Sequence, residues 1–389
     1  MEINQDTSFK DFFKKEIRKT EIIKNSKVFE IAYLPNEIFK RAETLDLFQE
    51  IARIIRFDKP THIFLRGLPG TGKTVTVKYL QEQLKGLGNA KWQIIYVNCR
   101  NRTAVDILKE LNELNSVRLI SEEQMTTCFI QNLKNNTILV LDEVDKSRYE
   151  ISNLLYRLSR ISESTENPTY KKLSTILISN KLDWENTLDG SVRSSLQMRV
   201  INFNSYNPDQ LKSILKERIR EGLISQDVIS DQLLDWICKM VTEERHGDCR
   251  TAIETLFYAA QNVEERGVKT IDMEDVKLGY GVCVKKIEKA RIMSLKNHEL
   301  YVLYAISKSD TKTYANIYNQ YKDIIRSKIH ERIFSYSKIF QDIKYLEDQN
   351  LVRKNKKEGS KELTIELTID ESAVEREYLT RSENINSSE

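Results

Sequence analysis

The sequence has no C-x-x-C pair, no clustered histidines and no long apolar run. Its five cysteines are scattered and odd in number, and its four histidines show no ligand spacing. This pattern argues against a disulfide framework or a zinc site and favours buried thiols. A membrane-spanning helix needs about 18 consecutive apolar residues, which are absent, and the N-terminal segment lacks the apolar core of a signal peptide. We therefore expect a soluble cytoplasmic protein with no membrane partner.

Length and composition indicate more than one domain. With 389 residues the chain exceeds a single typical domain, and we expect two or three. Hydrophobic residues make up 40% of the chain and charged residues 31%, so it can bury cores beneath a heavily charged surface. The net charge of +3 identifies no partner, because the distribution of charge matters more than its sum.

A glycine-rich segment, Gly67–Thr74 (GLPGTGKT), fits the phosphate-binding pattern G-x-x-x-x-G-K-[ST] at every fixed position. Residues 62–66 predict a strand before it and 75–85 a helix after it, which is the context that this pattern requires. Backbone N–H groups and the helix N-terminus then form a positive cradle for phosphates. Lys73 is expected to reach the β- and γ-phosphates, and the Thr74 hydroxyl to hold Mg²⁺. A chance Lys-Thr pair in a glycine-rich turn is the weaker interpretation.

Two apolar segments that end in polar residues predict the other half of this site. Residues 136–141 precede Asp142 and Glu143, and residues 173–179 precede Asn180. An Asp at the end of a buried strand beside the loop can hold Mg²⁺ through water, and the adjacent Glu can activate the attacking water. The Asn180 amide can hold that water. Acidic residues also end strands for structural reasons, and Asn is a common turn residue.

The remaining pattern predicts an α/β domain followed by a helical region. Further buried strands are expected at 93–98 and 200–203, with helices between, and Thr103 and Ser121 are candidate N-caps of helices within 101–134. Alternating strands and helices predict a parallel sheet with ligand chemistry at the carboxyl ends of its strands.

Residues 207–290 read as helices. Within them Arg250 stands in a first helical turn, where a cation opposes the helix dipole unless an anion is nearby. This makes Arg250 a candidate γ-phosphate contact, although a solvated Arg is the default interpretation.

An extended segment, 28–35, and a helix precede the phosphate loop. Such a segment and helix commonly wrap over the adenine of a bound nucleotide, which would bring Leu34, Pro35 and Arg41 to the site. The same pattern could equally reflect plain packing.

The C-terminal region is basic and differs in pattern from the rest. Residues 291–360 carry 14 Lys or Arg against eight Asp or Glu, an excess of six positive charges. One helix is expected around Ile339, Ile343 and Leu346, and two strands joined by a basic turn follow, which predicts a winged helix-turn-helix. A charge run is usually a solvated face, but this arrangement favours DNA binding. The candidate DNA contacts are Ser335, Ser337, Lys338, Lys344, Lys354, Lys356 and Lys357. Residues from about 375 onward are polar and expected to be disordered.

These motifs in this order resemble the AAA+ replication initiators of the origin-recognition type, found in archaea and eukaryotes. The resemblance covers about residues 26–370. Gly67–Thr74 is similar to the Walker A motif of the family, Leu141–Asp145 (LDEVD) to Walker B, Asn180 to sensor 1 and 247–250 (GDCR) to sensor 2. The Leu34-Pro35 pair and the segment 40–43 before the loop, and the winged helix after it, complete the order.

The resemblance implies an ATP/ADP-switched initiator that binds double-stranded origin DNA and helps to recruit the replicative helicase, with slow, Mg²⁺-dependent ATP hydrolysis. It is expected to be nucleoid-associated and to work with other initiator subunits. Catalytic roles are expected for Glu143, Lys73, Asn180 and Arg250, and Mg²⁺ binding for Thr74 and Asp142. Nucleotide binding is expected for Leu34, Pro35, Arg41, Gly67, Pro69, Gly70, Thr71, Gly72, Lys73, Thr74 and Val75. The expected domains are an N-terminal arm (1–25), an AAA+ base (26–204), a helical lid (205–290), a winged helix (291–372) and a polar tail (373–389). The insertion within 101–131 is expected to contact DNA as well.

The sequence departs from the family pattern in three places. Ser191 stands where the family usually has the Arg that reaches a neighbour's nucleotide, and Arg193 or Arg199 could substitute. Lys40 replaces the usual His, and the 101–131 insertion is short. The chain therefore resembles a divergent member.

Two other functions stay open at this point. One is an AAA+ regulator or loader, such as a transposition helper or clamp-loader-like subunit, whose winged helix binds protein. The other is an adaptor that binds ADP tightly and scarcely hydrolyses ATP. The intact Glu143 argues against the adaptor, and the basic C-terminal region argues against a purely protein-binding role.

Overall fold

The computed structural model describes residues 22–88, 91–113, 121–147, 149, 151–160, 171–326, 332–356 and 363–386. The chain forms two compact units, Met1–Tyr280 and Gly281–Glu389. Among the described residues, no helix has the length and apolar character that a membrane crossing requires. Three of the cysteines (Cys99, Cys238 and Cys283) are buried as expected, whereas Cys128 is exposed.

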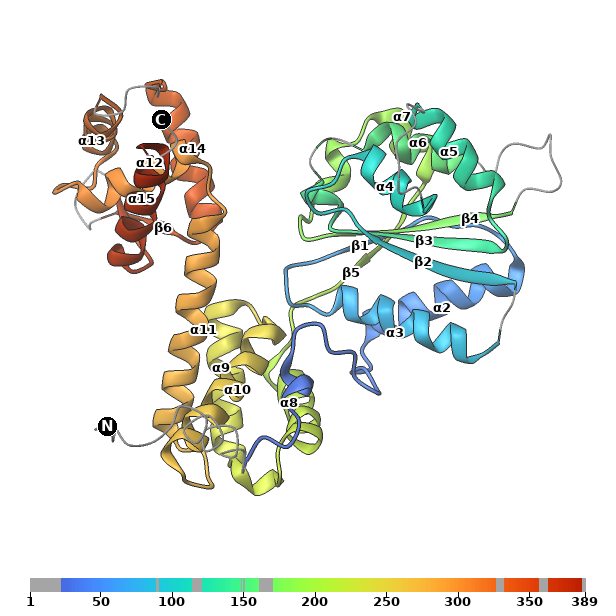
Figure 1. Cartoon of the computed structure of the whole chain (residues 1–389), viewed down its shortest axis with the longest axis horizontal. Helices are drawn as coiled ribbons and strands as arrows, with labels where there is room; N and C mark the ends of the chain where they lie inside the picture. Colours follow the sequence, from blue (N-terminus) through green and yellow to red (C-terminus); the bar gives the residue numbers. More distant parts are fainter. Residues whose placement is uncertain are drawn as a thin grey trace, which may run out of the picture. The chain divides into compact units, whose positions relative to one another are not determined.

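The first unit contains a five-stranded parallel sheet in the order β2-β3-β4-β1-β5 (Figure 1). The strands are β1 (Ile63–Arg66), β2 (Trp92–Asn98), β3 (Asn136–Asp142), β4 (Leu173–Ser179) and β5 (Arg199–Asn202). Every residue of β3 and β4 is buried, because helices cover both faces of the sheet. The predicted α/β architecture is confirmed.

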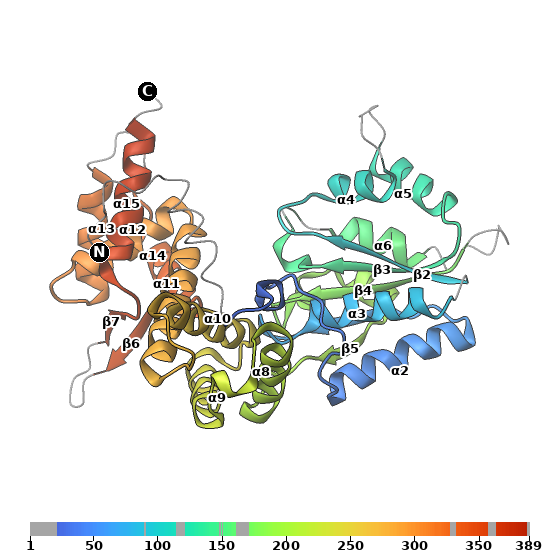
Figure 2. The ribbon, with the colours of Figure 1, turned by 60° about the horizontal axis from the view of Figure 1, so that its bottom comes forward.

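Helices pack on the two faces of this sheet as separate layers (Figures 1 and 2). The layer of α2 (Ala42–Phe57) and α3 (Lys73–Gly86) packs on inward side chains such as Leu65 and Val140. The opposite layer packs on Phe64 and Leu139 and consists of α4 (Ala104–Leu111), α5 (Glu122–Gln131), α6 (Ser152–Arg160) and α7 (Gly190–Leu196). Short 3₁₀ turns lie at Val144–Lys146 (η2) and Trp184–Thr187 (η4). Strand residues alternate between the layers, as the two-residue period of a strand requires.

A helical lid follows the sheet and completes the first unit. It contains α8 (Pro208–Gly222), η5 (Gln226–Val228), α9 (Asp231–Arg245) and α10 (Cys249–Arg266). Asn207 caps α8 in a reciprocal capping box with Gln210. The next helix, α11 (Met273–Met293), begins in the first unit and ends in the second. The lid boundary predicted at residue 290 lies within this helix, and the two units divide after Tyr280.

The start of the described chain packs on the lid. The backbone N–H groups of Ile22 and Ile23 donate to Glu264 Oε1 at 3.0 and 2.8 Å. Phe29, in the 3₁₀ turn η1 (Ser26–Phe29), lies 5.5 Å from Phe257 of α10, measured between ring centroids. Residues on both sides of the boundary predicted after residue 25 therefore contact the lid.

The second unit has the arrangement of a winged helix. Its helices are α12 (Asn297–Lys308), α13 (Tyr314–Arg326) and α14 (Tyr336–Asp348), followed by the antiparallel strands β6 (Val352–Lys356) and β7 (Leu363–Leu367) (Figure 2). A bridge between Thr313 and Thr364 ties the start of α13 to β7. Ile339, Ile343 and Leu346 form the buried face of α14, so this prediction is confirmed.

The expectation of a disordered tail is wrong for residues up to 386. Residues Glu371–Asn386 form a helix, α15. Its Val374 is fully buried in the core of the second unit. Tyr378 stacks on Tyr304 of α12 with 3.8 Å between ring centroids, and Arg381 Nη1 donates to the Leu295 carbonyl at 2.7 Å. A few residues on one helical face are enough to anchor this otherwise polar segment.

Candidate nucleotide site and nucleic-acid interface

The phosphate loop lies between β1 and α3, as predicted. Gly70 and Gly72 have φ angles of 76° and 85°, conformations that glycine adopts without strain. A Cβ atom at Gly70 would collide with the Asp248 side chain, and one at Gly72 would collide with the Tyr206 hydroxyl. The two glycines therefore allow Tyr206 and the N-cap of α10, Asp248, to approach the loop closely.

Lys73 begins α3, and its ammonium group folds back over the loop. Its Nζ donates to the carbonyls of Gly67 at 2.7 Å and Leu68 at 2.9 Å. The residue is 5% exposed. Burial lowers the pKa of Lys73 to about 8, and the carboxylate of Asp142 opposes this only in part.

Asp142 is the last residue of β3 and accepts hydrogen bonds from the neighbouring strand β2 and from the phosphate loop. The Thr74 hydroxyl and the Tyr96 hydroxyl both donate to Asp142 Oδ2 at 2.7 Å. The backbone N–H of Glu143 donates to Asp142 Oδ1 at 2.8 Å. Proximity to the carboxylate adds to burial in raising the pKa of Tyr96, so that this hydroxyl remains a donor. Asp142 and Thr74 thus meet at the edge of the loop.

Glu143 follows β3 with a φ of 55°, which is unusual for a residue with a side chain. Strained backbone of this kind concentrates at functional sites. Its carboxylate accepts a hydrogen bond from Asn98 Nδ2 at 3.1 Å and lies 3.6 Å from Arg100 Nη1. The end of β2 therefore holds the Glu143 side chain.

Asn180 stands at the end of β4, beside the end of β3. Its backbone N–H donates to Asp145 Oδ1 at 3.0 Å. The other oxygen, Asp145 Oδ2, is buried with no hydrogen-bond partner among the described residues. The Asn180 side chain borders the same cavity as Asp142 and Glu143.

The lid contributes two arginines, Arg250, which was predicted from the sequence, and Arg218, which was not. Arg250 lies in the first turn of α10, where its backbone N–H donates to the capping residue Asp248 at 3.0 Å. Cys249 N donates to the Gly70 carbonyl at 3.3 Å, which ties this turn to the loop. Arg218 of α8 is 7% exposed, and its guanidinium lies 4.6 Å from the Tyr33 ring centroid. Burial lowers its pKa.

These groups surround a cavity of about 460 Å³ between the sheet edge and the lid. The predicted residues that line it are Leu34, Pro35, Gly70, Thr71, Gly72, Lys73, Thr74, Val75, Asp142, Glu143, Asn180 and Arg250. Gly67 and Pro69 are in the loop but outside this lining. Lining residues that sequence reasoning missed include Tyr96, Asn98, Arg100, Tyr206 and Arg218.

Arg41 lies behind the loop instead of in the cavity wall. Its Nη1 donates to the Asn204 carbonyl at 2.8 Å, and its Nη2 donates to the Thr71 carbonyl. The guanidinium lies 4.2 Å from the Tyr206 ring centroid and the residue is 6% exposed. Arg41 therefore holds the loop in place, and the predicted direct contact with nucleotide has no support in this geometry.

In the second unit, the candidate DNA contacts centre on α14. Ser335 is its N-cap, and Ser337 and Lys344 are exposed. Two other candidates have acidic partners on α14: Lys338 Nζ donates to Asp342 at 2.6 Å, and Lys354 donates to Glu347. The Lys356 side chain and the whole of Lys357 lie outside the described residues.

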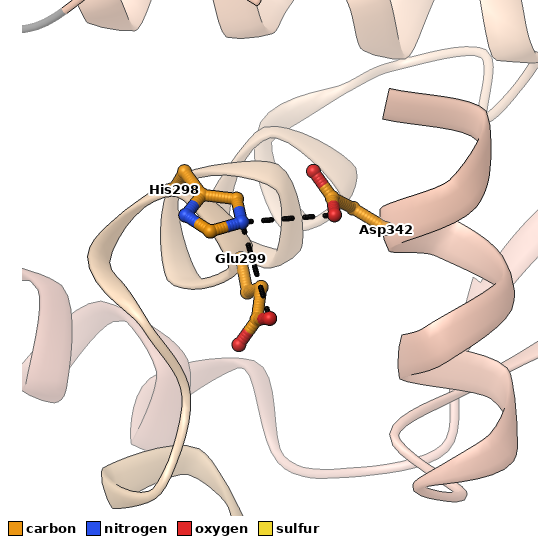
Figure 3. Close-up of side chains that lie close together, drawn as sticks. All are labelled: His298, Glu299 and Asp342. Carbon is orange, nitrogen blue, oxygen red and sulfur yellow. Dashed lines mark ion pairs between the residues drawn. The ribbon is translucent and has the colours of Figure 1, made fainter. Parts of the chain in front are cut away.

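Asp342 also belongs to a cluster with His298 and Glu299 from the first turn of α12 (Figure 3). His298 Nε2 lies 3.7 Å from Asp342 Oδ1 and 3.9 Å from Glu299 Oε1, distances too long for hydrogen bonds. Asp342 is 1% exposed, and its Oδ1 already accepts from the Lys338 ammonium. The cation that pairs with Asp342 is therefore Lys338, one turn away on α14 itself, and His298 places the start of α12 beside this pair.

Comparison with known proteins identifies the family. Residues 55–181 match an AAA domain, and residues 212–280 match a Cdc6 AAA+ ATPase-type lid domain. The ORC1-type DNA replication protein 1 of Sulfolobus acidocaldarius is 30% identical over 329 residues, which are 78% of this chain and 79% of that protein. The chain belongs to the ORC1-type DNA replication proteins.

Two further comparisons agree with this family. The ORC1-type DNA replication protein of Thermococcus onnurineus is 28% identical over 341 residues, 82% of this chain and 81% of that protein. The Aeropyrum pernix ORC1 protein, solved in complex with DNA, has a TM-score of 0.74 and 25% identity and covers 92% of this chain and 98% of its own. The ORC1-type fold thus extends through both units.

This ORC1-type chain lacks the expected Arg at position 191, and the two proposed substitutes differ in environment. Arg199 forms ion pairs with Asp46 at 2.9 Å and Glu50 at 2.8 Å. Arg193 lies on α7, is exposed, and contacts Asn186 at 3.4 Å. Of the two, Arg193 is the one whose guanidinium is not held by carboxylates in the described part of the chain.

Proposed function

We propose that this chain initiates DNA replication by binding double-stranded origin DNA, with ATP or ADP in the first unit as the switch. One observation carries the proposal: a complete phosphate-binding site and a winged helix occur in one chain of the ORC1-type family. As a chromosome-bound initiator, it would act at the nucleoid in the cytoplasm, with other initiator subunits and the replicative helicase as partners.

In this proposal the loop and Lys73 hold the nucleotide phosphates, and Thr74 and Asp142 hold Mg²⁺. The residues fit this ion, since a hydroxyl and a carboxylate oxygen lie together at the loop, and Mg²⁺ prefers oxygen ligands beside substrate phosphates. Bound Mg²⁺ would neutralise charge that develops on the phosphates. Glu143 takes the proton from the attacking water, and Asn180 positions that water.

We attribute slow hydrolysis to Glu143, whose side chain is already held by other residues before the attacking water binds. Its carboxylate accepts a hydrogen bond from Asn98 and lies near Arg100, and both contacts hold the side chain in place. Release of Asn98 would be part of each turnover. ATP would then persist long enough to act as a timer for the initiator.

Arg250 and Arg218 would couple the presence of the γ-phosphate to the position of the lid. Both border the cavity from the lid side, and a guanidinium binds phosphate oxygens with two parallel hydrogen bonds. Loss of the γ-phosphate would remove these bonds and let the lid move against the sheet domain. This is the physical basis that we propose for an ATP/ADP switch.

DNA binding is assigned to α14 and the β6–β7 wing, with a second contact from residues 101–131. In a winged helix the recognition helix enters the major groove and the wing contacts the backbone. The exposed Lys344 is the simplest phosphate contact on α14. Lys338 and Lys354 would have to leave their carboxylate partners to reach phosphates.

Footprinting on the DNA that flanks the gene tests the proposal. The full chain with Lys344→Glu should bind less tightly at every site, because a phosphate contact becomes a repulsion. Lys269→Glu, a charge reversal at an exposed lysine of the first unit, is the matched control and should bind as the wild type does. Absence of any retarded complex at low salt, together with intact ATP binding, would overturn the initiator role and favour a loader whose winged helix binds protein.

A further inference from the structure

The exposed face of α14 carries aromatic side chains that have no role in the phosphate contacts proposed above. Tyr336 and Phe340 are each 47% exposed, although they stand on the helix that the winged-helix arrangement would present to DNA. They lie four residues apart, on one side of the helix. Solvation alone does not explain two large aromatic rings at these positions.

Both rings are held by aromatic residues of α13. Phe340 stacks on Tyr314 with 5.0 Å between ring centroids and an interplanar angle of 28°. Tyr336 meets Tyr318 edge to face at 5.2 Å and 90°. Each ring therefore has one supported side and one open side. A rigid, apolar surface of this kind makes contacts at a low cost in conformational entropy.

The polar groups beside the rings restrict the partner. Among the side chains that the structure describes, the exposed ones of α14 are Tyr336, Ser337, Phe340, Gln341, Lys344 and Tyr345, none of which is acidic. The acidic residues Asp342 and Glu347 are paired with Lys338 and Lys354. The described side chains of this face are thus apolar along one edge and positive or neutral elsewhere, which suits the major groove of DNA.

The side chains of this helix also restrict which bases it can read. Guanine is usually read by Arg or Lys, whereas Gln can form two hydrogen bonds with adenine, and apolar groups contact the C5-methyl group of thymine. No arginine occurs in Tyr336–Asp348, and its exposed lysine, Lys344, is assigned to a phosphate. The exposed Gln341 and the two aromatic rings then favour A·T pairs.

We propose that Tyr336 and Phe340 are specificity-determining residues that contact thymine methyl groups in the major groove. The inference rests on the proposed function, since it assumes that α14 enters DNA. The two rings would present their open sides to consecutive methyl groups, with Gln341 directed at the neighbouring adenine and Lys344 at a phosphate. Tyr314 and Tyr318 act as positioning residues behind the rings.

Uracil in place of thymine tests this directly, because it removes only the methyl group from the major groove. The full chain is titrated with two 24-base-pair duplexes, alternating d(AT) and alternating d(AU), by fluorescence anisotropy at one salt concentration. A lost methyl contact is expected to weaken binding about fourfold, from the transfer free energy of one buried carbon. The ratio of the two affinities is the readout, because a partial folding defect in a variant would lower both affinities by the same factor.

The wild-type chain should prefer the d(AT) duplex. Phe340→Ala and Tyr336→Ala should each lose part of this preference, and the double variant should bind both duplexes equally. Phe340→Leu keeps an apolar contact and should retain more of the preference than Phe340→Ala does. Leu379→Ala removes an exposed apolar group from α15 and should leave the wild-type ratio unchanged. Equal binding of both duplexes by the wild type would overturn the inference while leaving the initiator function intact, whereas no binding to either duplex would overturn the function itself.

Discussion

Nucleotide affinity should fall steeply as the pH rises above about 8, because Lys73 must be protonated to bind phosphates. Burial lowers the pKa of Lys73 from 10.5 to about 8 in the free protein. Bound phosphates favour the ammonium form and raise this pKa again. Since the complex binds one more proton than the free protein does, affinity is highest below pH 8 and declines above it.

The size of the effect follows from the pKa. If the complex keeps its proton up to pH 10, Kd for ATP should rise roughly 25-fold between pH 7.5 and pH 9.5. Burial raises the pKa values of Tyr206 and Cys249, which also border the cavity, to about 12, so neither contributes in this range. Titration calorimetry in buffers of different ionisation enthalpy would measure both Kd and the proton uptake.

Lys73→Arg is the matched control, because a guanidinium stays charged throughout the range. Its affinity should be lower but independent of pH. A wild-type Kd that stays constant from pH 7.5 to pH 9.5, with no proton uptake, would refute the assignment of Lys73 as the buried phosphate contact.

Three further outcomes are expected. Glu143→Gln should slow single-turnover ATP hydrolysis by about 100-fold or more while ATP affinity stays similar; an unchanged rate would remove Glu143 from the chemistry. Burial lowers the pKa of His62 to about 4, so folding stability that is present above pH 6.5 is lost as the pH falls, by roughly 2 kcal/mol between pH 7 and pH 5. Urea unfolding of His62→Gln should not show this loss. A loss equal to that of the wild type would count against His62 as its source. Val374→Asp should destabilise the second unit by roughly 3 kcal/mol or more, because it buries an unpaired charge, whereas Leu379→Asp at an exposed position of α15 should change the melting temperature little.

The parts of the structure that follow from local pattern were predictable. Gly67–Thr74 has a fixed spacing that only one backbone geometry satisfies. The caps at Thr103 and Ser121 were recognisable because a capping box involves only residues three positions apart. In both, the N-cap side chain and the N3 side chain each bond to the backbone N–H of the other residue. The ends of β3 and β4 placed Asp142 and Asn180 near the loop because parallel strands end at one edge.

Contacts between distant segments were not predictable in this way. Arg41 binds the Thr71 and Asn204 carbonyls, and nothing in the neighbouring sequence distinguishes this role from contact with a nucleotide. Arg218 left a signal, since it lies between Leu215 and Ile219 on the buried face of α8. A charged residue in such a position indicates a buried polar partner or a ligand.

The C-terminal helix shows how composition can mislead. Residues 371–386 are polar on average, but Val374 and Tyr378 lie one turn apart and face α12. Two anchoring residues and the ion pair between Lys308 and Glu375, at 2.9 Å, are too few to stand out from a polar segment. Their partners on α12 are about 70 residues away in the sequence, so local periodicity could not reveal the contact.

A photocrosslink would show directly whether α14 contacts DNA. A benzophenone amino acid is placed at Ser337, on the exposed face of α14, or at Leu379, on the exposed face of α15, and each full-length protein is irradiated with a labelled duplex. If α14 binds DNA, a protein–DNA crosslink should form from position 337, with little or none from position 379. A stable complex that crosslinks from position 379 but not from position 337 would contradict it.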